Sequence, residues 1–275
     1  MLVDPSRPAG GYPDYPLWSY PVRSQGLAYA PRRMSISVAE IQRYLRSVTS
    51  RDREAVPAGA FVLYVHPTER HPFLNYAIPA PGVVSGDGSE LVGAARQRGL
   101  VPRLEYLDVC FPWVEEALAA SGFTREGRLR LMTCSSIARL DAGNLDLARV
   151  ETSSPLAGAT LAVTRSAFGE PPPNEADVTR WRGPAIAGIV DGQVVGAAAW
   201  TPVIHGMSEI VGVAVSPAMR RRGIGGALTA AATQAAFDEG ASVVLLTPGD
   251  DDTARVYEHA GFRDTTTMMH LRCPA

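Results

Sequence analysis

The residues Glu209-Ile-Val-Gly-Val-Ala-Val-Ser-Pro-Ala-Met-Arg-Arg-Arg-Gly-Ile-Gly-Gly-Ala-Leu228 join a strand-like run to the start of a helix. The β-favouring residues stop at Ser216-Pro217, and Gly223 and Gly225 then open a long alanine-rich stretch. Glycines at such a junction let backbone N–H groups point outward with no Cβ in the way. The helix dipole adds roughly half a positive charge at the same point. This stretch therefore predicts an anion-binding turn between a strand and a helix.

Three positive charges stand at the entrance of the predicted turn. Arg220, Arg221 and Arg222 directly precede its first glycine, and guanidinium groups pair well with phosphate. The third glycine of a dinucleotide fingerprint is missing, and a Gly-Lys-Ser/Thr loop is excluded because the chain has no lysine. An ordinary tight turn followed by a solvated arginine run is the alternative interpretation.

Strands and helices alternate on both sides of this turn. In the second half, the patterns predict strands at 145–150, 185–190, 194–200, 209–215, 242–247 and 262–271, and helices at 156–168, 175–181, 225–239 and 253–259. Asp191-Gly192 predicts a tight hairpin between two of these strands. In the first half, they predict helices at 35–47, 89–98 and 112–120, and strands at 61–65, 73–78, 103–109 and 123–134. The alternation predicts an α/β layered fold.

The chain is expected to consist of three parts. Residues 1–33 are rich in proline and tyrosine without apolar periodicity, which predicts a disordered leader. Ala-Ser-Gly-Phe at 120–123 and His-Ala-Gly-Phe at 259–262 each follow a helix and precede a cysteine, with phenylalanine and cysteine eleven residues apart. The repeat favours duplication of an α/β unit. We therefore expect one domain at 34–140 and another at 141–275.

The pattern Arg220-x-x-Gly223-x-Gly225, after a strand ending in Val213-Ala214-Val215-Ser216-Pro217, resembles that of the GNAT superfamily of N-acetyltransferases. The resemblance extends over 145–273, since the hairpin and the segment Val256-Tyr-Glu-His-Ala-Gly-Phe262 fall where that family has them. It implies two GNAT-like mixed-sheet domains in tandem. The N-terminal domain is expected to be degenerate, because its counterpart stretch 81–90 offers two acidic residues and no arginine.

The resemblance also implies acetyl-CoA as acyl-donor cosubstrate and assigns the residues that bind it. The backbone amides of the turn would hold the pyrophosphate, and the end of the preceding strand would pair with the pantetheine arm. The implied cofactor-binding residues are Val213, Ala214, Val215, Arg220, Arg221, Arg222, Gly223, Ile224, Gly225 and Gly226.

Two residues are candidates for proton transfer. Glu209 stands at the start of the motif strand, where some GNAT enzymes carry a catalytic glutamate, and is the candidate general base. Tyr257, four residues before Gly261, matches the family's usual general-acid tyrosine. A solvated carboxylate and a packed core tyrosine are the alternatives. The family often has asparagine where this chain has Asp250, a departure that leaves this contact to the cofactor open and favours a helix cap.

Composition excludes several other classes of function. A net charge of −2 gives no general attraction for nucleic acid or an anionic membrane. No window approaches the about 18 apolar residues of a membrane span, and the N-terminus lacks a charged-then-apolar signal. The three cysteines and five histidines are scattered, so no metal site is expected. We therefore expect a cytoplasmic protein, a monomer or a homodimer, that binds neither nucleic acid nor membrane.

The sequence thus predicts an acetyl-CoA-dependent N-acetyltransferase that transfers the acyl group to a primary amine. The absence of lysine excludes acetylation of the chain's own side chains, so the acceptor must be external: a small-molecule amine or a protein N-terminus. A catalytically silent acyl-CoA-binding sensor or scaffold is the alternative function.

Overall fold

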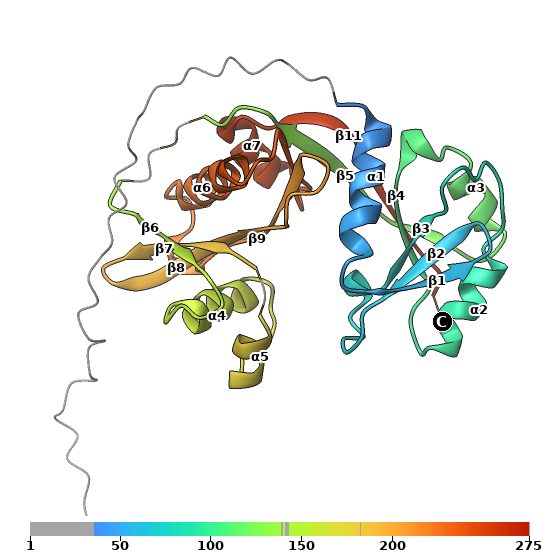
Figure 1. The fold of residues 1–275 in the computed structure, drawn as a ribbon, viewed down its shortest axis with the longest axis horizontal. Helices are drawn as coiled ribbons and strands as arrows, with labels where there is room; N and C mark the ends of the chain where they lie inside the picture. Colours follow the sequence, from blue (N-terminus) through green and yellow to red (C-terminus); the bar gives the residue numbers. More distant parts are fainter. Residues whose placement is uncertain (1–35, 139, 141–142, 182, 275) are drawn as a thin grey trace, which may run out of the picture. The chain divides into compact units, whose positions relative to one another are not determined.

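The computed structural model describes residues 36–138, 140, 143–181 and 183–274, which belong to one compact unit. The leader predicted for 1–33 and the residues at the predicted boundary near 141 lie outside this description. Within the described residues, the α/β fold class is confirmed (Figure 1).

One mixed sheet of eleven strands carries the fold, in the order β1-β2-β3-β4-β11-β5-β10-β9-β8-β7-β6. The strands are β1 (Glu54–Ala58), β2 (Phe61–Val65), β3 (Tyr76–Pro79), β4 (Arg103–Leu107), β5 (Thr124–Cys134), β6 (Asp146–Val150), β7 (Ala185–Val190), β8 (Gln193–Trp200), β9 (Met207–Val215), β10 (Val243–Leu246) and β11 (Arg263–Arg272). Most neighbours are antiparallel, whereas β10 is parallel to β9 and β3 to β4.

Two strand predictions in the first half need correction. β1 was not predicted, because this edge strand contains Pro57 and has only one fully buried side chain. The strand predicted at 73–78 is instead the 3₁₀ turn η1 (Pro72–Leu74) followed by β3. The buried side chain of Asn75 closes this turn by donating to the backbone oxygens of Glu69 and His71, both at 2.9 Å.

Helices cover both faces of the sheet. They are α1 (Val38–Thr49), α2 (Ser89–Gln97), α3 (Val114–Ala119), α4 (Ala157–Ala167), α5 (Glu175–Arg180), α6 (Ile224–Asp238) and α7 (Asp251–Ala260). Around β8 and β9, α6 packs on one face and α4 on the other (Figure 1). No helix among the described residues is long and apolar enough to cross a membrane.

Helix α1 begins at a capping box and packs its apolar side on the centre of the sheet. The backbone N–H of Ser37 donates to the Glu40 carboxylate at 2.8 Å, and the Glu40 N–H donates back to the Ser37 hydroxyl at 3.3 Å. The buried cluster under α1 unites this helix with five strands. Its members are Ile41, Tyr44, Leu45, Leu107, Leu131, Met207, Val243, Leu245 and Met268.

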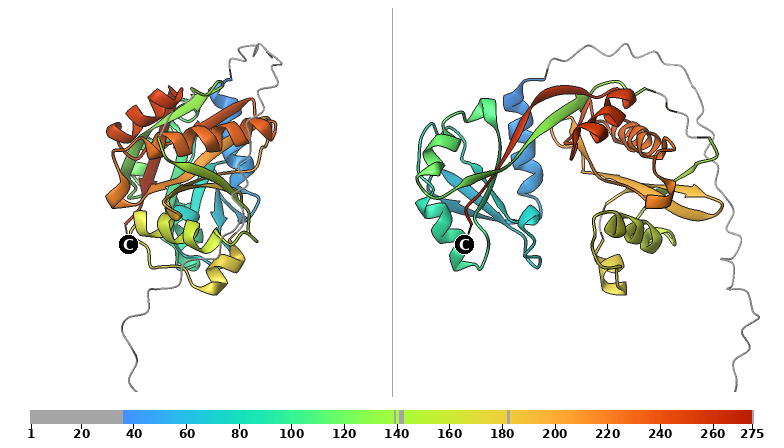
Figure 2. Two further views of the ribbon diagram at one scale, coloured as in Figure 1. Left: turned by 90° about the vertical axis from the view of Figure 1, so that its left-hand side faces the viewer. Right: turned by 180° about the vertical axis from the view of Figure 1, so that it is seen from behind.

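The strands β5 and β11 connect the two halves of the chain and run side by side (Figure 2). The end of β5 pairs with β10 in the second half, and the end of β11 pairs with β4 in the first. Accordingly, Met269, Leu271 and Cys273 are buried in the hydrophobic core of the first half. The domains at 34–140 and 141–275 stay a prediction, and β5 and β11 each pair with strands of the other half.

The pairing of β11 with β4 predicts that a residue near the C-terminus stabilises the first half. Leu271→Ala removes a side chain that is 1% exposed, so we expect the free energy of unfolding to fall by about 2–5 kcal/mol. Urea denaturation measures the loss. Arg272→Ala, at the exposed neighbouring position, is the matched control and should change the free energy little. Equal stability of Leu271→Ala and wild type would contradict the assigned core.

Candidate functional site

Two residues in the turn between β9 and α6 adopt a left-handed backbone conformation. After the 3₁₀ turn η3 (Pro217–Met219), Arg221 and Gly223 both have positive φ, 64° and 76°. Gly223 is the N-cap of α6, and no side chain caps the helix. The left-handed conformation suits glycine and strains most other residues. The helix therefore begins with its amide groups open.

Those amide groups are free to bind a ligand. Among the described residues, no partner is found for the backbone N–H groups of 221–226; the first that bonds is Ala227 N–H, to Gly223 O at 3.1 Å. Arg220, Arg221 and Arg222 are exposed and form no ion pair with any described residue. Free amides, a helix N-terminus and three unpaired cations fit a diphosphate.

The two glycines after the turn serve different needs. A Cβ added to Gly225 would meet only the Val215 side chain, at 3.8 Å, so this position leaves the approach to the turn open. A Cβ added to Gly226 would lie 3.1 Å from Leu140 Cδ1, and the glycine is buried. The predicted binding residue Gly226 thus has a packing role in α6.

The parallel strands β9 and β10 are paired only along their first residues. Their last matched pair is Glu209 with Leu245, although β9 continues to Val215. On its other edge β9 stays paired with β8, through a register shift beside Gly212, which has φ 62°. No described strand pairs with the β10-facing edge of β9 beyond Glu209. An extended ligand can therefore pair with this edge near Val213, Ala214 and Val215.

The backbone of Glu209 is fixed at this point of separation. Its N–H donates to Thr201 Oγ1 at 2.8 Å, and its carbonyl accepts from the Thr201 N–H at 2.9 Å. Thr201 Oγ1 also shares a hydrogen bond of 2.6 Å with the hydroxyl of Tyr44, which is fully buried on α1. A helix of the first half thus holds the candidate base of the second.

The electrostatic surroundings of Glu209 favour proton uptake near neutral pH. Burial raises the pKa of its carboxyl to about 7; repulsion from Glu105 adds to the rise, and Arg53 opposes it. A base with such a pKa exists in both protonation states at neutral pH, as proton transfer requires.

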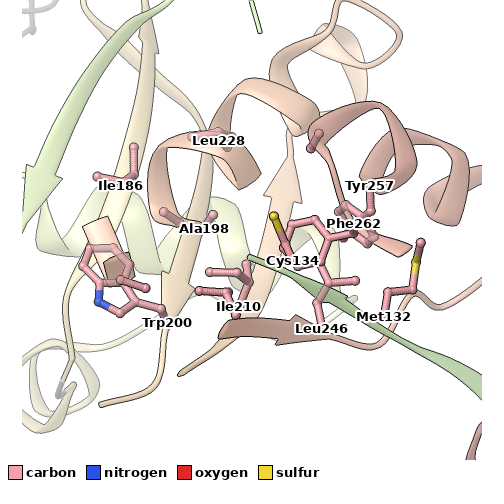
Figure 3. Close-up of a cluster of buried hydrophobic side chains, with 14 of the residues drawn as sticks. Met132, Cys134, Ile186, Ala198, Trp200, Ile210, Leu228, Leu246, Tyr257 and Phe262 are labelled. Atoms are coloured by element: carbon pink, nitrogen blue, oxygen red, sulfur yellow. The ribbon is translucent and has the colours of Figure 1, made fainter. Parts of the chain in front are cut away.

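Tyr257 lies on the other face of the sheet. It packs in the core with Phe262, at 6.2 Å between ring centroids, and near Cys134 (Figure 3). Burial raises the pKa of Tyr257 to about 12, with a further contribution from the charge of Asp250. Tyr257 therefore keeps its proton at neutral pH. Asp250 caps α7 by accepting from the Thr253 N–H at 2.7 Å, as predicted.

The two candidate catalytic residues lie on opposite faces of the sheet. Glu209 belongs to the α1 face of β9, next in alternation to Met207, whereas Ile210 and Tyr257 share the core cluster under α6. This arrangement suits a reaction in which one proton is taken up and another is delivered.

Three residues of the first half that lie near Glu209 were not predicted from the sequence: Tyr44, Arg53 and Glu105. Their proximity depends on the order of the strands, which the sequence does not reveal. Among the described residues, no group of His, Cys, Asp and Glu is arranged to hold a metal.

Comparisons with known proteins identify the second half. The model of the Acetyltransferase (GNAT) family matches residues 160–262. No relative was found among curated protein sequences. A solved GCN5-related N-acetyltransferase from Kribbella flavida is 29% identical, with a TM-score of 0.73, over 88% of this chain and 97% of that one.

Two more distant solved structures share the fold. A putative GNAT acetyltransferase from Novosphingobium aromaticivorans is 20% identical, with a TM-score of 0.52, over 80% of this chain and 92% of that one. A tandem GNAT protein from the clavulanic acid biosynthesis pathway is 13% identical, with a TM-score of 0.52, over 79% and 80% of the two chains. Residues 160–262 are thus a domain of the GNAT acetyltransferase family, in a chain whose α/β fold is shared by a tandem GNAT protein.

Proposed function

We propose that the protein is an acetyl-CoA-dependent N-acetyltransferase acting on a primary amine of an external acceptor. The observation that carries the proposal is the open N-terminus of α6, with its free amides and unpaired arginines, beside the gap between β9 and β10. The residues that would hold the cofactor are Arg220–Ile224 and Gly225 at the pyrophosphate, and Val213–Val215 along the pantetheine arm.

Glu209 is the proposed general base for the acceptor amine. Acetyl-CoA, when bound, supplies an acyl thioester whose transfer to an amine yields an amide and a thiol. A free alkylamine has a pKa of about 10.4 and is mostly an ammonium in solution, so it must first lose one proton to water, and a second proton leaves the nitrogen as the amide forms. Glu209 accepts a proton as the nitrogen–carbon bond forms, directly or through water. The hydrogen bonds to Thr201 keep its backbone in place.

Tyr257 is the proposed general acid for the departing thiolate. Its raised pKa keeps the phenol protonated, so it delivers a proton to the sulfur as the carbon–sulfur bond breaks. The backbone amides of Val213–Val215 are the candidate donors to the acyl oxygen, where negative charge develops. We further propose that the first half binds no CoA, that the acceptor is a small molecule or a protein N-terminus, and that the protein acts in the cytoplasm as a monomer or homodimer.

Steady-state release of free CoA from acetyl-CoA, measured with a panel of primary amines, tests the proposed function directly. Product formation should be confirmed by the mass increase of the amine. Tight binding of acetyl-CoA without turnover of any amine would favour the silent sensor instead.

The proposed pyrophosphate-binding turn at 220–225 is tested by Gly223→Val. A side chain there is strained at φ 76° and blocks the amides, so we expect the affinity for acetyl-CoA to fall at least ~10-fold, about 1.4 kcal/mol. Calorimetric titration measures it and should give one site per wild-type chain. Ala218→Val, at an exposed position before the turn, is the control. Circular dichroism checks that Gly223→Val is folded. Unchanged affinity for acetyl-CoA in the folded variant would refute the proposed pyrophosphate-binding turn.

The acid role is tested by Tyr257→Phe. This variant removes only the hydroxyl, so turnover should fall by ~10²–10⁴ while acetyl-CoA affinity stays nearly constant. The pH–rate profile and a calorimetric titration separate the two effects. Tyr106→Phe, at another buried tyrosine outside the site, controls for loss of packing. Full activity of Tyr257→Phe would mean that the tyrosine only packs.

The base role is tested by the pH dependence of Glu209→Gln. Wild-type kcat/KM should rise with pH around 7 as the carboxyl ionises, and this limb should be absent from the variant, which higher pH partly rescues by deprotonating the amine. Stability provides a second readout. Since the folded pKa exceeds the unfolded value, wild type loses stability relative to Glu209→Gln as pH rises from 4.5 to 7. The assignment would be contradicted if wild type and Glu209→Gln showed the same pH dependence of kcat/KM and the same pH dependence of stability.

A further inference from the structure

Polar side chains lie beside the patch of sheet that α1 covers, and we call them the polar rim. Leu107 of β4, Met207 of β9 and Met268 of β11 belong to this patch. Side chains alternate along a strand, so the residues two positions away, Glu105, Glu209 and His270, face the same side of the sheet.

The topology also places these three residues beyond the same end of the patch. β9, β10 and β11 run in one direction and β4 in the other, as the pairings of the intervening strands require. Glu209 and His270 follow the covered residues of their strands, whereas Glu105 precedes the covered residue of its own. Arg103 joins Glu105 to His270, and the charge of Glu105 acts on Glu209, so residues of both halves lie near one another here.

Helix α1 connects the two sides of the rim. Tyr44 reaches the Glu209 side through its hydrogen bond to Thr201. Thr49, near the end of the helix, shares a hydrogen bond of 3.0 Å with the hydroxyl of Tyr76 on β3. The guanidinium of Arg53 lies over the Tyr76 ring, 5.0 Å from its centroid.

Some charged side chains of the rim form ion pairs and others do not. Arg103 is fully buried and bonds Glu105, Glu126 at 2.6 Å and the Nδ1 atom of His270 at 2.8 Å. Among the described residues, Arg53 forms no ion pair and neither does Glu209. Both are partly buried, and each influences the other, since the charge of Arg53 lowers the pKa of Glu209. The rim thus keeps one free cation and one free carboxylate.

We propose that this rim is the acceptor site and that the acceptor is a small zwitterion, with its amine facing Glu209 and its carboxylate paired with Arg53. The inference rests on the proposed function, because Glu209 receives the proton of the same amine. Guanidinium and carboxylate form a charge-assisted pair, often with two hydrogen bonds. A second ammonium at this position would instead meet the charge of Arg53. The hydroxyls of Tyr44 and Tyr76 border the site.

Equilibrium binding tests the proposal without requiring turnover. The CoA-saturated protein is titrated with glycine, L-alanine, β-alanine and γ-aminobutyrate, each compared with its primary amide, and with 1,4-diaminobutane. We expect at least one acid to bind ~10-fold or more tightly than its amide, as loss of a charged hydrogen bond implies. Arg53→Gln should reduce this ratio ~10-fold. Arg51→Gln, at an exposed arginine two residues away, should keep the wild-type ratio.

The outcomes separate this inference from the proposed function. Equal affinity for acid and amide in every pair, tightest binding of the diamine, or the same ratio in Arg53→Gln and wild type would overturn it. Transfer of acetyl groups to amines without any preference for a carboxylate leaves the proposed function standing and refutes the zwitterion. Carboxylate-dependent binding through Arg53 without acetyl transfer supports the zwitterion site and refutes the proposed function.

Discussion

The end of hydrogen bonding between β9 and β10 at Glu209 and Leu245 is the constraint on which the site depends. Strands in a sheet normally satisfy each other's backbone groups, so an edge released inside a sheet has to find other partners. Here the released edge of β9 leads directly into the open N-terminus of α6. Backbone donors and acceptors of two different elements thus form one continuous surface, and side chains need only supply the charges around it.

The same separation bears on the two candidate proton-transferring groups, which lie in different cores. Glu209 is next to the apolar patch under α1, and Tyr257 is packed with Phe262 under α6. In a closed sheet a backbone layer would isolate them. Their separate surroundings raise both pKa values: the carboxyl titrates near neutrality, which suits a base, whereas the phenol stays protonated but becomes a weaker acid.

The strands and helices of the second half could be predicted from the sequence, because apolar periodicity, the Asp191-Gly192 turn and the glycine-opened helix are local signals. The cap at Asp250 was predicted for the same reason. The neighbours of Glu209 could not be. Arg53 and Glu105 are more than a hundred residues away in sequence, and their place beside Glu209 results from the pairing of β5 and β11 with strands of the other half. Gly226 shows that a motif position can have two roles, because its predicted contact with the cofactor stays a prediction while its lack of a side chain also permits packing against Leu140.

The pairing of β11 with β4 has a consequence for synthesis of the chain. Ribosomes release the N-terminal part of a protein first, and domains commonly fold as they emerge. In this chain, Met269 and Leu271 fill the core built by residues that left the ribosome long before them. Until the last strand appears, β4 presents an unpaired edge above an incomplete core, a surface on which nascent chains can associate wrongly. The core of the first half can therefore be completed only after the last strand has been synthesised.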